Sequence, residues 1–324
     1  MKEVQLKALE RAKALLESGE VARVVGWKKG DFCFDPSPAT FESVEELNDF
    51  VYDWFCGANL SKYLIAISKK EGKTAVFLKP CDTYSFNQLV KEHRISREKI
   101  HVIAIECMAK LDIEKIKAKG ATAVTGVEVV DKEVKVAPAY GEETYYKPDV
   151  VLTKCATCNK THQVKDEEII LHERPERDVN RFEEVEKLEA MTAEERFAFW
   201  KAQLSKCIRC NACRNVCPAC SCLKCVFDNP QSGISAKAND SEFEEKLFHI
   251  IRAFHVSGRC TDCGECSRVC PQNIPLHLLN RKFIKDIDGF YGEYQAGETS
   301  EGKTPLTSYT EADEDPSVVM AEVK

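Results

Sequence analysis

The sequence predicts two domains: an N-terminal α/β domain with a mostly parallel sheet, and a mainly helical, cysteine-rich domain after it. The chain has 324 residues, which is enough for two separate hydrophobic cores. In the first half, short apolar runs alternate with helical patterns, and this alternation is typical of parallel α/β sheets. The chain contains 17 cysteines, and its second half carries two cysteine runs of identical spacing.

The α/β domain is expected over residues 1–165. Apolar residues at steps of three and four predict a helix over residues 3–18, with Leu6, Leu9, Ala12 and Leu16 on its inner side. Ser43 is the expected N-cap of a helix over residues 43–55. The elements that follow are buried strands at 74–78 and 101–105, helices at 82–92 and 113–118, strand-like segments at 121–130 and 133–136, and a short strand at 150–153.

A highly charged linker is expected over residues 166–194, and the helical domain follows over residues 195–290. Within the linker, Phe182, Val185 and Leu188 are spaced to give part of it one helical face. Thr192 is the expected N-cap of a helix over residues 193–206. Apolar spacing predicts two further helices, at 241–254 and 275–287. The inner face of the helix at 241–254 is expected to carry Phe243, Leu247, Ile250, Ile251 and Phe254.

The end of the chain, residues 291–324, is polar and acidic. From Gly292 onward it holds eight acidic and two basic residues, a net charge of −6. A segment with this composition cannot bury enough apolar surface to fold, so we expect a disordered tail.

Composition excludes several classes of function. The net charge is −7 and no basic face is apparent, so nucleic acid is not an expected partner. No run of about eighteen apolar residues is present, so we expect no membrane insertion. The N-terminus lacks the apolar block of a secretory signal, and we expect a cytoplasmic protein. In that reducing compartment, clustered cysteines indicate metal binding and not disulfides.

Two ferredoxin motifs lie in the helical domain. The first run is Cys207, Cys210, Cys213 and Cys217, and the second is Cys260, Cys263, Cys266 and Cys270, each with a proline after its last cysteine. In bacterial dicluster ferredoxins three cysteines wrap one [4Fe-4S] cluster and the fourth ligates the other cluster. One cluster is therefore expected on Cys207, Cys210, Cys213 and Cys270, and the other on Cys260, Cys263, Cys266 and Cys217. Two complete copies with proline argue against a pair of structural zinc sites.

Basic residues are interspersed with these ligands. They are Arg209, Arg214, Lys224, Arg259 and Arg268. Positive charge near a cluster should favour its reduced form, although exposed side chains do so weakly.

Four cysteines of the α/β domain form a separate candidate metal site. Cys81 and Cys107 each follow a predicted buried strand, and Cys155 and Cys158 follow the strand expected at 150–153. Parallel neighbouring strands would bring all four thiols to the carboxyl edge of one sheet, where such sheets bind ligands. The metal would be a third [4Fe-4S] cluster or a zinc ion, because spacing does not separate them. In the alternative, Cys81 and Cys107 are small buried hydrophobic residues.

The remaining cysteines carry weaker signals. Cys220, Cys222 and Cys225 follow the first motif, and we expect loop packing or hydrogen bonding beside the second cluster, with metal ligation and redox activity as alternatives. Cys33 and Cys56 are expected in the core. His162, His249, His255 and His277 are interpreted as helix-face or surface residues. The sequence contains no glycine-rich dinucleotide motif, no P-loop and no evident Ser-His-Asp arrangement.

The motifs together resemble a known family. Lys79-Pro80-Cys81-Asp82, then Ile103-Ala104-Ile105-Glu106-Cys107, then Cys155-Ala156-Thr157-Cys158 resemble proteins related to the beta subunits of deazaflavin-reducing hydrogenases and formate dehydrogenases. The run from Cys217 to Cys225 is similar to the C-terminal part of such proteins, and the resemblance covers roughly residues 70–285. It implies electron transfer between a redox enzyme and a soluble carrier in a multisubunit anaerobic complex. Typical beta subunits use a flavin, but here the ferredoxin module follows the α/β domain and no motif supports FAD.

The function expected from these observations is electron relay through [4Fe-4S] clusters, in a subunit that carries electrons and does not convert substrate. Its partners would be other redox subunits, possible flavoproteins among them, in a hydrogenase, formate dehydrogenase or heterodisulfide-reductase-like complex. One alternative is a flavin-dependent oxidoreductase subunit between a hydride carrier and the clusters. Another is a thiol or heterodisulfide-type enzyme that uses the N-terminal four-cysteine site.

Overall fold

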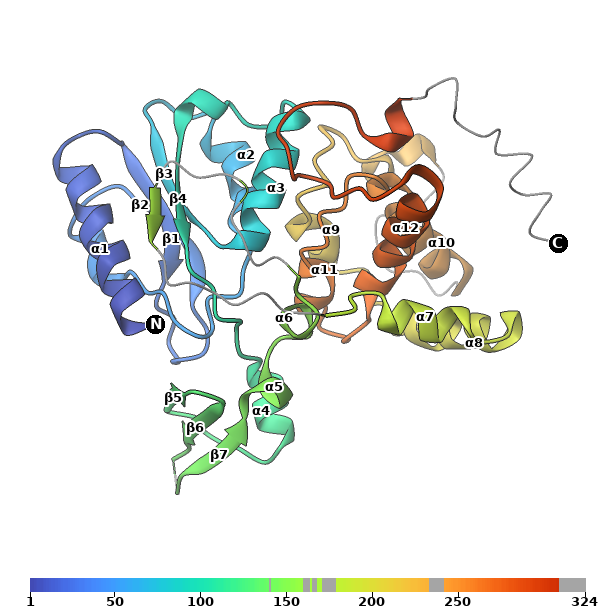
Figure 1. Cartoon of the computed structure of the whole chain (residues 1–324), viewed down its shortest axis with the longest axis horizontal. Coiled ribbons are helices and arrows are strands. Elements are labelled where there is room, and N and C mark those ends of the chain that lie inside the picture. The colour runs from blue at the N-terminus through green and yellow to red at the C-terminus, as the bar shows by residue number, and fades with distance from the viewer. Residues whose placement is uncertain (140, 160–163, 165–167, 171–178, 233–241, 309–324) are drawn as a thin grey trace.

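The computed structural model describes residues 1–139, 141–159, 164, 168–170, 179–232 and 242–308. Figure 1 shows an α/β domain that contains the N-terminus, a helical domain beside it, and a small three-stranded sheet that projects away from both. This order of an α/β part and a helical part confirms the fold class predicted from the sequence.

A five-stranded sheet in the order β2-β1-β3-β4-β8 forms the centre of the α/β domain. Strands β1, β3, β4 and β8 pair in parallel, and β2 pairs antiparallel with β1 at the edge. β3 and β4 are buried along their whole length, as is typical of parallel strands covered on both faces. The strands are β1 (Arg23–Lys28), β2 (Ser37–Phe41), β3 (Thr74–Leu78), β4 (Ile100–Ile105) and β8 (Glu168–Ile170).

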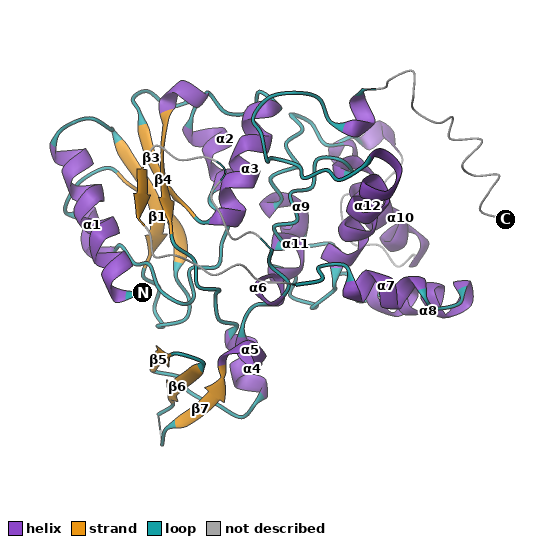
Figure 2. Cartoon of the chain, in the orientation of Figure 1, coloured by secondary structure: helices purple, strands orange, loops and turns teal. Residues whose placement is uncertain are grey.

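Helices cover both faces of this sheet (Figure 2). α1 (Lys2–Glu17) lies on one face, and α2 (Leu64–Ile67) and α3 (Pro80–Lys91) lie on the other. Two 3-10 turns, η2 (Ser61–Tyr63) and η3 (Arg97–Lys99), precede α2 and β4. The proline at the start of α3 fixes the backbone for the first helical turn, so Cys81 stands at the carboxyl end of β3.

Helix α1 buries a different face from the one predicted. Leu6 is 56% exposed, and the buried residues are Val4, Ala8, Ala12 and Leu15. Two helical stripes of similar hydrophobicity compete here. The stripe with two alanines is selected because small side chains let the helix backbone approach the sheet closely.

The helix expected over residues 43–55 is wrong apart from the 3-10 turn η1 (Glu46–Asp49). Phe50 forms an isolated bridge with Lys28, and the Val51 N–H donates to the Trp27 carbonyl at 2.9 Å. The ring of Phe50 also packs edge-on against Phe41. Burial of aromatic side chains at the end of β1 therefore outweighs the helical pattern of this segment.

The projecting sheet consists of β5 (Gly126–Val130), β6 (Glu133–Ala137) and β7 (Glu143–Tyr146), all antiparallel. Two of these strands overlap predicted segments, and β7 was not predicted. The sheet packs on α4 (Ile113–Ala118) and α5 (Lys147–Val150), where Ile116, Val134, Val136 and Val150 share one apolar cluster.

The strand expected at residues 150–153 is also wrong. Val150 ends α5, Val151 makes a single antiparallel bridge with Leu111, and Thr153 begins α6 (Thr153–Ala156). Pro148 lies in the first turn of α5 and pre-sets the helical backbone angle. This outweighs the β-propensity of the two valines.

The segment 166–194 is more than a linker. β8 lies within it and pairs with β4, and α7 (Glu183–Glu189) buries Val185 and Leu188. The carboxylate of Glu168 in β8 accepts hydrogen bonds from Arg11 and His101, so charge that suggested a linker is neutralised in the fold. Residues 166–167 and 171–178 lie outside the described residues.

The helical domain contains α8 (Ala193–Leu204), α9 (Ala212–Val216), α10 (Glu242–Val256), α11 (Glu265–Arg268) and α12 (Leu276–Tyr291), with 3-10 turns η4 (Val226–Asp228), η5 (Pro230–Ser232) and η6 (Pro305–Thr307). α8 begins as predicted, with a reciprocal capping box between Thr192 and Glu195. None of the described helices is long and apolar enough to cross a membrane.

Helix α10 buries a face of mixed polar and apolar residues, and this face differs from the predicted apolar one. Phe243, Ile250 and Phe254 are exposed, whereas Glu245, Phe248, His249, Arg252, Ala253 and Val256 are buried. The ring of Phe254 packs on Phe283 of α12 at 4.7 Å between centroids. The inner face of α10 meets the cysteine loops, so local chemistry and not hydrophobicity decides the helix rotation.

The prediction of a disordered tail is wrong for residues 292–308. Gly297 packs against Tyr84 of α3 with a backbone φ of +78°. The Asn87 side-chain amide donates to the Glu298 carbonyl at 3.4 Å, and Ala296 is buried. Backbone contacts thus hold a segment that has few apolar side chains. Residues 309–324 lie outside the described residues.

Candidate metal centres

The two cysteine runs form two loops with the same backbone shape. In the first loop Arg209 and Asn211 have positive φ angles of 50° and 62°, and in the second Asp262 and Gly264 have 57° and 67°. These positions are the second and fourth after the first cysteine of each run. Three non-glycine residues in this disfavoured region mark a functional backbone constraint. Each loop leads into a short helix, α9 or α11.

The last cysteine of each run lies near cysteines of the other run. Cys270 shares an apolar cluster with Cys207 and Cys213 of the first run and with Cys266 of its own run. Cys217 shares a cluster with Cys260.

The thiols of the second run show the same crossing. The thiols of Cys260, Cys263 and Cys266 each interact with the thiol of Cys217. Burial raises the pKa of Cys207 to about 12 and that of Cys266 to about 11. Such thiols ionise when a metal binds, so the crossed sets fit metal ligation.

The loop after the first motif folds back on Cys217. A hydrogen bond from the Cys220 thiol lowers the pKa of Cys217 to about 6 against the effect of burial, and the charge of Arg252 adds to it. Cys222 is exposed and Cys225 is half-buried beside Arg214. Of the three, Cys220 thus adopts the expected hydrogen-bonding position beside the second set.

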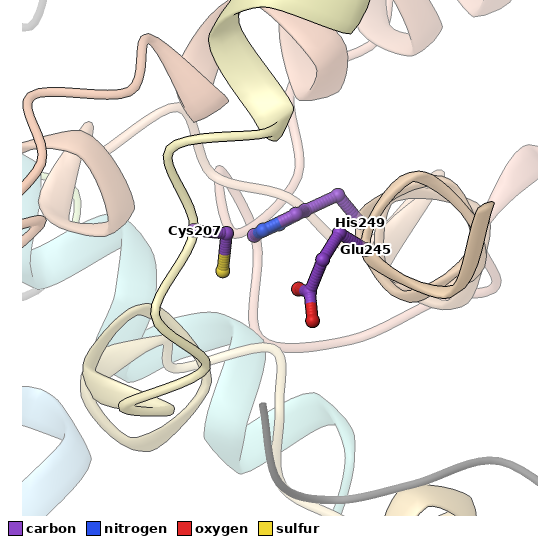
Figure 3. Close-up of side chains that lie close together, drawn as sticks. All are labelled: Cys207, Glu245 and His249. Carbon is purple, nitrogen blue, oxygen red and sulfur yellow. The ribbon is translucent and has the colours of Figure 1, made fainter. Parts of the chain in front are cut away.

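A buried polar group, which the sequence interpretation missed, lies against Cys207. The sulfur of Cys207, a carboxylate oxygen of Glu245 and a ring nitrogen of His249 lie within 4.8 Å of one another (Figure 3). Neither ring nitrogen of His249 has a hydrogen-bond partner among the described residues. Burial, then the charges of Arg252 and Arg209, lower its pKa to about 3, so it is neutral at pH 7. Of the two expected positions, helix face or surface, His249 adopts the first, on the buried face of α10.

The four N-terminal cysteines line one cavity. Its walls include Cys81, Cys107, Cys155 and Cys158. Burial raises the pKa of Cys155 to about 11, and the charges of Cys107 and Cys158 contribute. The four thiols come together without the third strand that was expected. Two backbone hydrogen bonds of 2.8 Å instead join the segment after Cys107 to the segment before Cys155. Leu152 N–H donates to the Lys110 carbonyl, and Asp112 N–H donates to the Val150 carbonyl.

Three lysines with almost fully buried side chains surround this cavity. Lys79 bonds to Asp82 at 2.7 Å and lies 4.4 Å from the ring centroid of Trp27. Lys110 donates to the Asp53 carbonyl at 2.5 Å, and Lys154 donates to the Gly57 carbonyl at 2.7 Å. All three line the cavity together with the thiols. Lys79 and Lys154 pair with the carboxylates of Asp82 and Glu265. Lys110 contacts a carbonyl and the ring of Tyr52, so its buried charge favours an anionic occupant.

The cavity also touches the second ferredoxin loop, because Asp262 and Cys263 form part of its wall. Glu265 in the same loop is fully buried, accepts a hydrogen bond from Asn59 N–H at 3.1 Å and pairs with Lys154. The hydroxyls of Ser85 and Thr261 are 2.9 Å apart across the same contact. The N-terminal cavity and the second cysteine loop therefore form one continuous structure.

The two isolated cysteines differ from each other. Cys56 is fully buried, as expected, and its thiol donates to the Asp53 carboxylate at 3.4 Å. Cys33 is exposed in the loop between β1 and β2, so the expectation of a core position is wrong. The sequence offered a signal for the buried lysines, since Lys79 and Lys154 each stand within two residues of a cysteine.

Comparison with known proteins agrees with these sites. A family model described as a 4Fe-4S dicluster domain matches residues 203–274. The F420-dependent formate dehydrogenase subunit beta of Methanocaldococcus jannaschii is 23% identical over 335 residues, covering 85% of this chain and 88% of that protein. The corresponding subunit 1 beta of Methanococcus maripaludis is 24% identical over 277 residues, covering 66% and 72%. These matches confirm the resemblance inferred from the sequence.

Two further matches are more limited. A putative ferredoxin-3 of Sinorhizobium fredii is 32% identical over 79 residues, which cover 24% of this chain and 75% of that protein. A chain of the F420-reducing [NiFe] hydrogenase complex from Methanosarcina barkeri aligns with a TM-score of 0.38 at 15% identity, covering 49% of this chain and 62% of that one. The last likeness is too weak to bear on the fold.

Proposed function

We propose that this chain relays electrons through three [4Fe-4S] clusters. Its helical domain belongs to the 4Fe-4S dicluster ferredoxins, and the chain as a whole is related to the beta subunits of F420-dependent formate dehydrogenases. Its partners are other redox subunits of a cytoplasmic complex. The observation that carries the proposal is the shared cavity wall. Cys263 belongs to the second ferredoxin set and also lines the cavity of the four N-terminal cysteines.

The ligands of the two ferredoxin clusters follow the crossed arrangement. Cys207, Cys210, Cys213 and Cys270 hold the first cluster, and Cys260, Cys263, Cys266 and Cys217 hold the second. The electrostatic contacts of Cys217 with the second run, and of Cys270 with Cys213, support this assignment. A bound cluster supplies one-electron chemistry, while the protein loops bury it and supply hydrogen bonds to its sulfurs.

The third site, on Cys81, Cys107, Cys155 and Cys158, suits a cluster better than a zinc ion. Tetrahedral zinc with bonds of about 2.3 Å places its sulfurs roughly 3.8 Å apart. In the described part of the chain, no three of these thiols lie within 4.8 Å of one another. A four-iron cluster spreads its thiolates more widely, and the buried Lys110 places positive charge beside it.

In this proposal the chain's own residues position the relay and keep water from it. The Lys154–Glu265 pair holds the N-terminal site against the second loop, and Lys110 places positive charge beside the buried thiolates. The hydride chemistry belongs to a partner subunit, because clusters exchange single electrons. A flavin, where the complex uses one, is likewise assigned to a partner.

The test is metal analysis of the anaerobically purified chain. Three clusters predict about twelve iron atoms, with no stoichiometric zinc. Cys107→Ala should lose about four of them and leave the dicluster signals intact, and Cys33→Ala, which removes an exposed thiol, should lose none. About eight iron atoms in the unaltered chain would limit the protein to its ferredoxin clusters. One zinc per chain would instead identify a structural N-terminal site.

A further inference from the structure

One buried cation of the helical domain has no paired carboxylate in the part of the chain that the structure describes. Arg252 lies on the inward stripe of α10, one helical turn after His249, and is 2% exposed. None of its three guanidinium nitrogens has a hydrogen-bonded oxygen or nitrogen partner among the described residues. An arginine buried without an anion is strongly disfavoured, so this position indicates that negative charge is supplied by something else.

The basic residues singled out in the sequence are not comparable with Arg252. Four of them are paired with carboxylates: Arg209 with Glu245 at 2.9 Å, Arg214 with Asp228 at 2.9 Å, Arg259 with Glu92 at 2.6 Å, and Arg268 with Glu265 at 2.7 Å. The fifth, Lys224, is exposed to solvent. The four arginines are thus neutralised by carboxylates, and solvent screens the charge of Lys224. Arg252 differs from all five because its charge is neither paired with a carboxylate of the described residues nor exposed to solvent.

Arg252 lies between the two ferredoxin sets on α10. One helical turn before it, a ring nitrogen of His249 lies within 4.8 Å of the Cys207 sulfur of the first set. One turn after it, Val256 packs in one apolar cluster with Cys217 and Cys260 of the second set. Arg252 also lines the cavity that contains Cys220.

We propose that Arg252 is a fixed cation shared by the two ferredoxin-type clusters, and that it raises the reduction potential of both. The inference rests on the proposed function, because it needs both clusters in place. A [4Fe-4S] cluster with four thiolates carries a charge of about −2 when oxidised and about −3 when reduced. A nearby cation stabilises the reduced form more, and a shared one also weakens the repulsion between two reduced clusters.

The experiment is an EPR-monitored redox titration of the full chain with its clusters, together with iron analysis. Arg252→Gln removes the charge and keeps a polar side chain. We expect the full iron content, with the midpoint potentials of both clusters lowered by at least 59 mV, which is a tenfold change in each one-electron equilibrium. Arg252→Lys keeps the charge and should move both potentials by less than half of that shift.

Lys246→Gln is the matched control, because it removes one positive charge from the same helix outside the buried stripe. The Lys246 ammonium lies 5.2 Å from the ring centroid of Phe197. The control should leave both potentials unchanged, since solvent screens this charge. Unchanged potentials in Arg252→Gln, or a shift in one cluster alone, would overturn the proposal.

Loss of clusters from Arg252→Gln is also informative. If Arg252→Lys then retains both clusters at the original potentials, the site requires the charge, as proposed. If both variants lose their clusters, the site requires the shape of arginine and the proposal is wrong. Fewer than eight iron atoms in the unaltered chain would instead contradict the proposed function, and not the role of Arg252.

Discussion

Glu265→Ala should loosen the contact between the α/β domain and the second cysteine loop. Glu265 is fully buried and accepts hydrogen bonds from Lys154, from the Arg268 guanidinium at 2.7 and 2.8 Å, and from Asn59 N–H at 3.1 Å. Burial works against its ionisation, but the charges of Lys154 and Arg268 hold its pKa well below the usual range.

The expected loss of stability comes from the charges left behind. The side chain of Lys154 is 6% exposed and cannot regain water, whereas that of Arg268 is 25% exposed and can partly do so. Removing one partner of a buried ion pair costs about 3–5 kcal/mol. Glu265→Gln keeps the shape and some hydrogen bonds and should cost about 1.5–3 kcal/mol. Adding Lys154→Met to Glu265→Gln should cost less than the two single changes together, because no unpaired lysine remains.

The assay is urea unfolding of the cluster-loaded chain under anaerobic conditions, followed by tryptophan fluorescence. Because the folded-state pKa of Glu265 is depressed, its contribution is fully present above the unfolded pKa of about 4.3 and is lost as the pH falls below it. The effect should therefore be constant at neutral and mildly alkaline pH. Glu183→Ala, which breaks an exposed pair with Lys187, should cost less than about 0.5 kcal/mol. A loss below about 1 kcal/mol for Glu265→Ala would refute the reasoning.

Three further changes test other parts of the structure. Cys217→Ser should disturb the cluster of Cys260, Cys263 and Cys266 in EPR spectra, and damage confined to the Cys207 set would contradict the crossed assignment. Gly297→Ala should destabilise the chain by more than about 2 kcal/mol in urea unfolding, because a Cβ there would meet the Tyr84 carbonyl oxygen at 1.9 Å. Gly292→Ala is the control: a Cβ there has nothing within 4 Å, so this change should cost only the backbone strain of about 1–2 kcal/mol. Equal losses of stability in the two variants would exclude the packing explanation. Thr192→Ala should cost about 0.5–2 kcal/mol through loss of the α8 capping box, and Thr192→Ser should restore most of it, so an unchanged unfolding midpoint in the alanine variant would show that the cap contributes nothing.

Several local predictions failed where two patterns of similar strength competed. In α1 and α10 the apolar stripes read from the sequence are partly exposed, and neighbouring stripes are buried. Helical periodicity predicts that a helix forms, but the rotation of that helix depends on what it packs against. For α10 the neighbours are the cysteine loops, so a polar stripe faces inward. The charged segment around Glu168 was misread because its partners Arg11 and His101 are distant in sequence.

The sequence alone was enough to find the dicluster domain, which a family model matches over residues 203–274. Cysteine spacing identified both ferredoxin motifs, the buried runs at 74–78 and 101–105 appear as β3 and β4, and the positions of Cys81, Cys107, Cys155 and Cys158 predicted that they meet. Spacing suffices there because the loop is local and its geometry follows from the order of residues. Only the tertiary structure placed the N-terminal cavity against Cys263, lined it with three buried lysines, and set Arg252 between the His249 and Val256 contacts with the two ferredoxin sets. These contacts join segments separated by tens to hundreds of residues, and no local pattern encodes which buried charge will face which thiol.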